Sequence, residues 1–326
     1  MVGYHAPIMS LRRNACPLAW GARRLRRRRT IAGGFGEAER SERGGGGRVG
    51  PKGRANPLRV PISVAVVACA ASWALVACAK PTARPAPTAP VEKLRLKVIR
   101  TFPHDPHAFT QGLLFFEGKF YESTGLNGRS SLRRVDPDSG VVERGVDLPA
   151  DLFGEGLARV GGRLFQLTWQ NQRALVWNLA TLHKEREISY QGEGWGLCFD
   201  GRHFIMSDGS DTLALRDAES FAKVGAIAVR RAGRAVRNLN ELECVEGVVY
   251  ANIWQDNHIA RIDPHTGEVT GWIDASGLLA PGEARTSDVL NGIAYLPATG
   301  HLALTGKLWP RIFEVELVPD ASPAAQ

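Results

Sequence analysis

The residues of this chain that are best suited to chemistry stand at matching places in five repeated segments. In order they are Gln111, Glu155, Trp195, Glu241 and Asn291, each just before an apolar strand core. In a fold that repeats around an axis, matching positions converge on one place, so we expect these side chains to surround one cavity. The carboxyls could transfer protons there, while the amides and the indole could hold a substrate.

A second set of polar and aromatic residues stands at the ends of the strands that follow. It comprises Glu122, Trp169, Asp208, Asn252, Trp254 and Lys307. Strand ends at one edge of a repeated fold present their side chains to the same opening. We therefore expect this set to line the substrate site, although each tryptophan could equally well pack between neighbouring sheets.

Glu155 is the carboxyl with the most distinctive surroundings. It stands in the run Phe153-Gly154-Glu155-Gly156-Leu157, between glycines and apolar residues. A carboxyl that water solvates poorly keeps its proton to a higher pH, because burial disfavours the charged form and raises the pKa. Carboxyls perturbed in this way are typical of acid–base catalysis.

Other catalytic patterns are absent from the sequence. There is no G-x-S-x-G elbow, no phosphate-binding loop and no H-E-x-x-H, and the eight histidines are scattered. His104 and His107 bracket Asp105-Pro106, which is more typical of a turn than of a metal site. We therefore predict no metal ligands.

A basic cluster stands between the third and fourth repeated segments and contains Arg230, Arg231, Arg234 and Arg237. Such a cluster is usually a solvated loop. The less favoured interpretation is that it holds a carboxylate of a substrate.

A strand-pair pattern must position all of these residues. It covers residues 109–124, 153–168, 194–208, 239–254 and 290–307, each as a strand, a glycine-containing turn and a second strand. The residues named first recur at intervals of 44, 40, 46 and 50. A third strand follows each pair and a fourth follows most of them, and four strands in ~45 residues are typical of a propeller blade.

The repeat predicts an all-β fold, a five-bladed β-propeller over residues 94–318. The chain ends before the last blade gains its fourth strand, so Leu94–Arg100 is expected to supply that strand and close the ring. A β-sandwich, the competing all-β interpretation, does not predict a fivefold period. Residues 319–326 are expected to be a C-terminal tail.

The basic charge of the chain belongs to its first 60 residues. The whole chain has 41 Lys and Arg against 33 Asp and Glu, but residues 1–60 hold 14 of the former and 3 of the latter. The remainder has 27 basic and 30 acidic residues, so its charge predicts no nucleic-acid partner. Residues 1–58 are expected to be a disordered low-complexity tail. The alternative is that translation starts later, at Val49 or Val60.

A lipoprotein-type signal segment is predicted over residues 59–78. Arg59 precedes an apolar run of 18 residues whose end, Leu75-Val76-Ala77-Cys78, resembles the bacterial lipobox. Cys78 would carry the lipid, and the alanine after it favours the outer membrane. The Pro- and Ala-rich residues 79–93 would tether a periplasm-facing domain in the cell envelope. An uncleaved transmembrane anchor is the alternative, since 18 apolar residues can just span a bilayer.

Two cysteines, Cys198 and Cys244, lie in the predicted propeller, at near-equivalent places in neighbouring repeats. An oxidising compartment permits a disulfide between them. We nevertheless favour two buried free thiols, because free cysteine is among the most buried residue types.

Nine motifs in order resemble one known family. From about Phe102 to Leu317 they are FPHDPHAFTQGL, YESTGLNGRSSLR, FGEGL, GWGL, SDGS, LNELE, ANIWQ, VLNGIA and TGKLWP. They are similar to the motifs of the glutaminyl-peptide cyclotransferases of the plant and bacterial type. That family often has an aromatic residue in place of Asn127, a difference that we expect to alter the loop.

The resemblance implies a five-bladed propeller that converts the N-terminal glutamine of peptides or proteins to pyroglutamate and releases ammonia. It implies catalysis without zinc and without a required cofactor, and it leaves open a structural ion in the central channel. We expect a monomer that is attached to the membrane by its lipid anchor only.

The resemblance also suggests a role for each candidate. Glu155 matches the glutamate of FGEGL and would move a proton between the two substrate nitrogens. Asn291, Gln111 or Lys307 could supply donors to the oxyanion. Glu241 could bind the substrate ammonium or support Glu155, and the tryptophans of both sets could hold the side chain and exclude water.

Two other functions remain open at this point. One is a non-catalytic propeller lipoprotein that binds peptides, which the intact Glu155 and the full set of tryptophans disfavour. The other is a metal-dependent propeller lactonase or related hydrolase, which needs Glu, Asn and Asp ligands in the channel.

Overall fold

The computed structural model describes residues 90–320, and this part of the chain is almost entirely β-structure. Within that range the only helical element is the short 3-10 turn η1 (Glu283–Arg285). The all-β prediction is therefore confirmed for the described residues. No helix among residues 90–320 is long and apolar enough to cross a bilayer.

Three antiparallel sheets of four strands come first along the chain, each with its strands paired in sequence order. The first sheet contains β2 (Thr110–Phe116), β3 (Lys119–Thr124), β4 (Ser131–Val135) and β5 (Val142–Asp147). The second contains β6 (Gly154–Val160), β7 (Arg163–Thr168), β8 (Arg173–Asn178) and β9 (Lys184–Ser189). The third contains β10 (Leu197–Phe199), β11 (His203–Met206), β12 (Thr212–Asp217) and β13 (Lys223–Ala228).

The remaining long strands form one eight-stranded sheet, in the order β16-β17-β18-β19-β1-β22-β21-β20. One half contains β16 (Leu239–Val245), β17 (Val248–Ile253), β18 (His258–Ile262) and β19 (Val269–Asp274). The other half contains β20 (Leu290–Leu296), β21 (His301–Gly306), β22 (Arg311–Pro319) and β1 (Glu92–Pro103). A small hairpin of β14 (Arg230–Arg231) and β15 (Arg234–Ala235) stands between β13 and β16.

The N-terminal strand β1 completes the last group of strands. It pairs antiparallel with β22, and its first four residues also pair in parallel with β19. The predicted placement of Leu94–Arg100 beside the last strand is therefore present. β1 begins at Glu92, inside the predicted tether, because Glu92 and Lys93 have backbone partners in β19.

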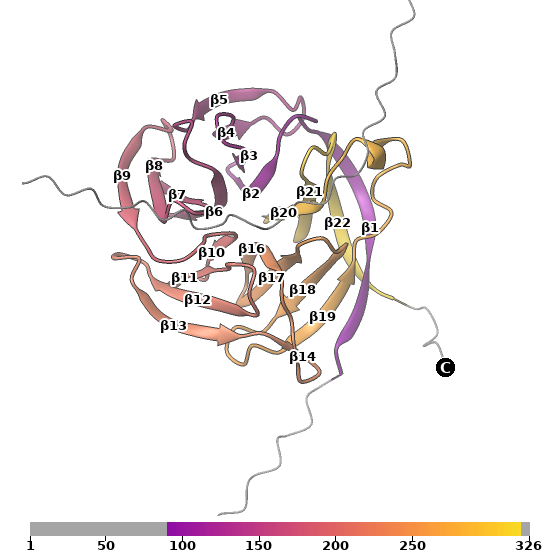
Figure 1. Cartoon of the computed structure of the whole chain (residues 1–326). Helices are drawn as coiled ribbons and strands as arrows, with labels where there is room; N and C mark the ends of the chain where they lie inside the picture. Colours follow the sequence, from indigo (N-terminus) through magenta and orange to yellow (C-terminus); the bar gives the residue numbers. More distant parts are fainter. Residues whose placement is uncertain (1–89, 321–326) are drawn as a thin grey trace, which may run out of the picture. The chain divides into compact units, whose positions relative to one another are not determined.

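The four-stranded groups are arranged around a common centre, with β2, β6, β10, β16 and β20 innermost (Figure 1). Glycines let these inner strands approach closely. A Cβ on Gly156 would lie 2.5 Å from the backbone N of Leu197, and one on Gly196 would lie 2.0 Å from the carbonyl O of Asn240. The inner strands therefore meet backbone to backbone, which brings residues at their starts together.

Apolar side chains fill the space between neighbouring sheets. Leu132, Leu164 and Leu175 are fully buried between the first and second sheets, and Phe204 and Phe221 belong to the cluster that joins the second sheet to the third. Each such side chain contributes about 1.5–3 kcal/mol when it leaves water. These contacts hold the sheets at the positions that the site requires.

The prediction of two free thiols is wrong. Cys198 of β10 and Cys244 of β16 form a disulfide, with their Cα atoms 5.4 Å apart. The inner strands β10 and β16 lie next to each other, which brings the two cysteines within the usual Cα separation for a disulfide.

Several predictions concern residues outside the described range. They are the tail (1–58), the signal segment (59–78) with lipidation at Cys78, the first part of the tether (79–89) and most of the C-terminal tail (321–326).

Candidate active site

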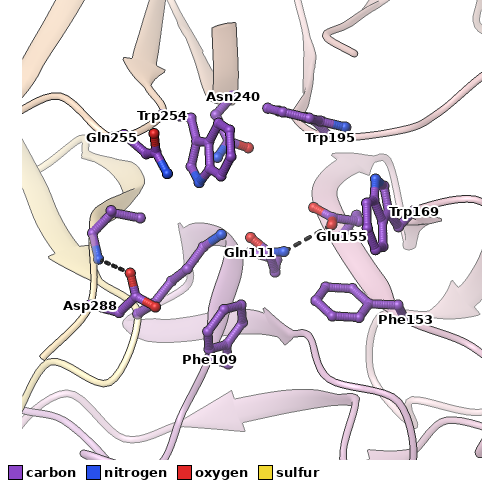
Figure 2. A pocket seen from close by; sticks show the side chains of 12 residues that line it. Phe109, Gln111, Phe153, Glu155, Trp169, Trp195, Asn240, Trp254, Gln255 and Asp288 are labelled. Carbon is purple, nitrogen blue, oxygen red and sulfur yellow. Dashed lines mark hydrogen bonds between the residues drawn. The ribbon is translucent and has the colours of Figure 1, made fainter. Parts of the chain in front are cut away.

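A cavity of about 410 Å³ lies where the inner strands begin and the second strands end. Figure 2 shows its side chains converging from several strands and loops. They are Phe109, Gln111, Phe153, Glu155, Trp169, Trp195, Asn240, Trp254, Gln255, Asp288, Val289 and Lys307.

Glu155 lies in the cavity wall and has only 4% of its surface exposed. Nε2 of Gln111, on the neighbouring strand β2, donates a hydrogen bond to Oε1 of Glu155 at 2.8 Å (Figure 2). Burial raises the pKa of Glu155 well above its usual 4.5; the charge of Lys307 opposes the rise and that of Glu193 adds to it. Burial therefore favours the protonated form of this carboxyl.

A second hydrogen bond holds the side-chain amide of Gln111 by its oxygen. Nδ2 of Asn291 donates to Oε1 of Gln111 at 3.1 Å and to the carbonyl O of Thr110 at 3.0 Å. Because an amide oxygen accepts and an amide nitrogen donates, these bonds orient Gln111 with its nitrogen toward Glu155.

Lys307 adds an amine to the lining of the same cavity. Its Nζ lies 4.8 Å from the ring centroid of Phe109, within reach of the ring's negative face. Burial lowers the pKa of Lys307, and the charges of Glu155 and Asp288 oppose that change. The cavity thus contains a buried amine whose pKa is lowered and a buried carboxyl whose pKa is raised.

Indole and phenyl rings form the rest of the wall. Phe153 and Trp169 meet edge to face at 5.6 Å between centroids, and so do Trp195 and Trp254. Glu193 accepts hydrogen bonds from Nε1 of Trp169 at 2.8 Å and of Trp195 at 3.1 Å. The rings therefore form an ordered apolar surface around the acid and the amine.

The family model for glutamine cyclotransferase matches residues 68–317. This chain belongs to the glutamine cyclotransferase family. It is 43% identical over 228 residues to a glutaminyl-peptide cyclotransferase of Arabidopsis thaliana, a match that covers 68% of this chain and 71% of the relative. The crystal structure of Myxococcus xanthus glutaminyl cyclase matches with a TM-score of 0.65 and 42% identity, over 71% of this chain and 99% of that chain. The family resemblance seen in the motifs is therefore confirmed.

The structure of this glutamine cyclotransferase family member brings part of the predicted site together in the cavity. The predicted residues that line the cavity are Gln111, Glu155, Trp169, Trp195, Trp254 and Lys307. They come from the starts of the inner strands and from the residues that follow the second strands.

Three predicted residues of the second strands lie elsewhere. Glu122 is buried outside the cavity lining, where it accepts a hydrogen bond from Thr110 Oγ1 at 2.7 Å and shares another with Nε2 of His104 at 3.0 Å. Asp208 accepts from Ser210 in an exposed turn. Asn252 is buried and accepts the backbone N–H of Gly292 at 3.0 Å, so it joins β17 to the inner strand β20 rather than facing a ligand.

The predicted equivalence of Glu241 with Gln111 and Glu155 is off by one residue. Leu113, Leu157 and Leu242 hold the same place in their strand pairs, which makes Asn240 the counterpart of Glu155. Glu241 takes the place that glycine has in the other four inner strands.

The carboxyl of Glu241 is tied to backbone instead of the cavity. Its Oε2 accepts from the N–H of Ile293 at 2.9 Å and its Oε1 from that of Leu113 at 3.2 Å. Burial raises the pKa of Glu241 well above its usual value, and the charge of Glu243 adds to the rise. Asn291 is also buried outside the cavity lining, and its contribution is the hydrogen bond that holds Gln111.

Sequence reasoning missed several wall residues. Phe109 and Phe153 stand two residues before Gln111 and Glu155, and the period of a strand could have placed them on the same face. Asn240 would have followed from the correct register. The remaining wall residues, Gln255, Asp288 and Val289, come from loops without periodicity, as does Glu193, which lies behind Trp169 and Trp195 as their hydrogen-bond partner.

Among residues 90–320, no group of three or more His, Cys, Asp or Glu side chains is placed to hold a metal ion. The polar groups of the lining residues are two carboxyls, three side-chain amides, the lysine amine and the indole N–H of Trp254, since those of Trp169 and Trp195 donate to Glu193. This arrangement can donate hydrogen bonds, transfer a proton and exclude water.

Proposed function

We propose that this chain is a glutaminyl-peptide cyclotransferase, which converts the N-terminal glutamine of peptides or proteins to pyroglutamate and releases ammonia. The observation that carries the proposal is the buried Glu155, bonded to Gln111 in a cavity walled by indoles. Membership of the glutamine cyclotransferase family and the 43% identity to the Arabidopsis enzyme support it.

The fold that we propose is a five-bladed β-propeller closed by the N-terminal strand. Three separate four-stranded sheets and the two halves of the eight-stranded sheet supply five groups of four strands, which supports this description. The inner strands of neighbouring blades bring their first residues together. In this way β2 and β6 place Gln111 within hydrogen-bond distance of Glu155.

The first step of the reaction joins two atoms of the substrate itself. The α-amine attacks the carbonyl carbon of the side-chain amide, and its ordinary pKa of ~8 allows it to be neutral. The carbonyl oxygen gains negative charge, which fixed donors must stabilise. We assign this role to the Lys307 amine and to the N–H of Gln111 that Glu155 does not use. Asn291 is left to a supporting role, because its amide nitrogen already donates to Thr110 and Gln111.

Glu155 then transfers one proton in each direction. As the bond from the side-chain carbon to the amide nitrogen breaks, Glu155 gives its proton to that nitrogen, and ammonia leaves. The resulting carboxylate takes a proton from the α-nitrogen, which is now part of the ring. Glu155 ends as it began, and no proton is gained or lost overall.

The aromatic wall assists by limiting water. Phe153, Trp169, Trp195 and Trp254 surround the reacting groups with apolar surface. In such surroundings the hydrogen bonds to the oxyanion are stronger than they are in water. The same surface would contact the aliphatic part of the glutamine side chain.

The proposed mechanism uses no metal and no cofactor. Whether a structural ion occupies the central channel does not affect any step. We further propose a monomer in the bacterial cell envelope, facing the periplasm and attached to the membrane by a lipid on Cys78. The basis for this placement is the signal-type sequence at residues 59–78.

The direct test incubates the full-length protein with glutaminyl-glycine amide and measures ammonia release, with and without a chelator. We expect turnover that the chelator does not reduce. Replacing Glu155→Gln removes the transferable proton and keeps the shape, so we expect a loss of kcat of about 10²–10⁴-fold without unfolding.

The matched control is Glu219→Gln, which makes the same chemical change at an exposed position in a turn. It should leave turnover unchanged. If the wild-type protein released no ammonia, the proposed function would be wrong, and chelator-sensitive ester hydrolysis would favour a propeller hydrolase instead. Full activity in Glu155→Gln would remove Glu155 from the proton transfer.

A further inference from the structure

The connection between β13 and β16 carries the arginine cluster, and none of its members contributes to the cavity described above. Arg230 and Arg231 form β14, and β15 begins at Arg234, so the segment folds back on itself as a short hairpin. Figure 1 shows this hairpin beside β19. The chain then passes through Arg237 and enters the inner strand β16.

A groove of about 580 Å³ lies along this hairpin. Its charged side consists of Arg231, Arg234 and Arg237, and its apolar side includes Ile253 and Trp272. The guanidinium of Arg231 lies 4.0 Å from the ring centroid of Trp272 and is thereby fixed in place. The groove thus combines a cation held against an indole ring, two further cations and an aromatic surface.

The groove has an excess of positive charge. Within residues 90–320, other arginines such as Arg100, Arg133 and Arg163 are paired with carboxylates, whereas no ion pair within 4.0 Å involves the arginines of the groove. The carboxylate that acts on Arg231 is that of Asp256, and Oδ1 of Asp256 is shared with the ring of His258 at 2.6 Å. A ligand with several carboxylates would supply the negative charge that balances these arginines.

The groove adjoins the wall of the catalytic cavity. Ile253 lines the groove, and the next residue, Trp254, lines the cavity. The backbone N–H of Trp254 donates to the carbonyl O of Asn238 at 2.8 Å. Asn238 itself stands between Arg237 of the groove and Asn240 of the cavity. An extended peptide advances about 3.3–3.6 Å per residue, so a few residues are enough to pass from one to the other.

We propose that this groove binds acidic side chains of the substrate, a few residues after its N-terminal glutamine. The preferred substrates are then peptides and proteins with Asp or Glu at about the third to fifth positions. This inference rests on the proposed cyclotransferase function and adds a substrate class to it. A peptide fits better than a flat anionic membrane, because the groove is hollow, partly apolar and adjacent to the cavity.

The test compares three substrates with matched first residues: Gln-Gly-amide, Gln-Gly-Glu-Glu-Glu-amide and Gln-Gly-Lys-Lys-Lys-amide. We expect kcat/KM to be about tenfold higher for the acidic peptide than for the basic one, as three exposed charge pairs would give. The difference should shrink at high salt, because salt screens exposed charges. Equal values for the two longer peptides would overturn the inference.

The variant Arg231→Gln/Arg234→Gln/Arg237→Gln should abolish the preference and leave Gln-Gly-amide turnover unchanged. A control with the same loss of charge is Arg95→Gln/Arg186→Gln/Arg202→Gln, at exposed positions outside the groove. It should retain the preference. If the control lost the preference as well, overall charge rather than the groove would be responsible, and the inference would fail.

A binding measurement separates this inference from the catalytic proposal. Fluorescence anisotropy of labelled Gln-Gly-Glu-Glu-Glu-amide does not require turnover, so groove binding can be established even if Gln-Gly-amide releases no ammonia. The last arm of the test measures binding of the wild type and the groove variant to vesicles that contain anionic lipid. If the groove variant lost binding to these vesicles while the wild type showed no preference for the acidic peptide, the groove would be a membrane contact and the inference would be wrong.

Discussion

Oε2 of Glu193 accepts a hydrogen bond from Nε1 of Trp169 at 2.8 Å, and the same oxygen accepts one from Trp195 at 3.1 Å. One carboxylate therefore fixes two indoles of the cavity that come from different sheets. Its negative charge also contributes to the raised pKa of Glu155. Glu193 does not line the cavity, so it is a positioning residue in the proposed reaction.

Replacing Glu193 should separate these two effects. Glu193→Ala removes both indole bonds, so we expect kcat/KM to fall about tenfold, mostly through KM. Glu193→Gln keeps an oxygen that can accept both indoles but removes the charge. In that variant the pKa of Glu155 falls, so activity should be lost at a lower pH on the alkaline side. The pH dependence of ammonia release measures both outcomes.

The control is Gln170→Ala. Gln170 donates to the other oxygen of Glu193 at 2.9 Å, and its loss leaves both indole bonds in place. We expect wild-type KM and an unchanged pH profile. A Glu193→Ala variant that bound substrate as tightly as the wild type would contradict the positioning role.

The repeat was predictable because two-residue alternation and turn chemistry leave a regular trace in the sequence. The register of one strand was not predicted. Four inner strands have a glycine before their first core residue, and Glu241 replaces it in the fourth repeat. Polar residues therefore occur at both Asn240 and Glu241. Only the pairing of Leu242 with Ala251 decides which one faces the cavity.

The residues predicted near the ends of the second strands fall into two groups, according to whether they follow the last strand residue or lie within the strand. Trp169, Trp254 and Lys307 follow the last strand residue and reach the cavity. Glu122 and Asn252 lie within their strands, where neighbouring sheets enclose them. The sequence shows the residue types but not the position of the strand end, which depends on backbone pairing. Glu193 carries no trace of its role in the sequence, because its two partners meet only in the folded chain.

The disulfide joins two neighbouring sheets and should stabilise the domain. Cys198 and Cys244 are separated by 46 residues, and a loop of that size typically gives about 2–4 kcal/mol when it is closed. We expect Cys198→Ala/Cys244→Ala to lower the free energy of unfolding by that amount in a urea titration and to leave turnover intact. A reducing agent should destabilise the wild type and not the variant. If alkylation of the unreduced, unfolded protein labelled both thiols, the disulfide would be absent.

Glu243, in the inner strand β16, is a carboxyl whose raised pKa should make the stability of the domain depend on pH. Its Oε1 accepts the backbone N–H of Tyr295 at 2.9 Å, and burial raises its pKa from 4.5 to about 8. Below pH 4.5 the folded and unfolded states both hold the proton. Between pH 4.5 and 8 only the folded state holds it, so stability falls as the pH rises and then levels off.

Replacing Glu243→Gln removes this dependence, since glutamine keeps an acceptor for the N–H of Tyr295 and does not ionise. The variant should become progressively more stable than the wild type from pH 4.5 to about 8, with a constant difference above that. We expect a gain of about 1–3 kcal/mol, less than the full pKa shift implies because solvent reaches part of the side chain. Urea titrations at several pH values measure it, with the exposed Glu219→Gln as control. A difference that stays the same at all pH values would show that Glu243 does not titrate as described.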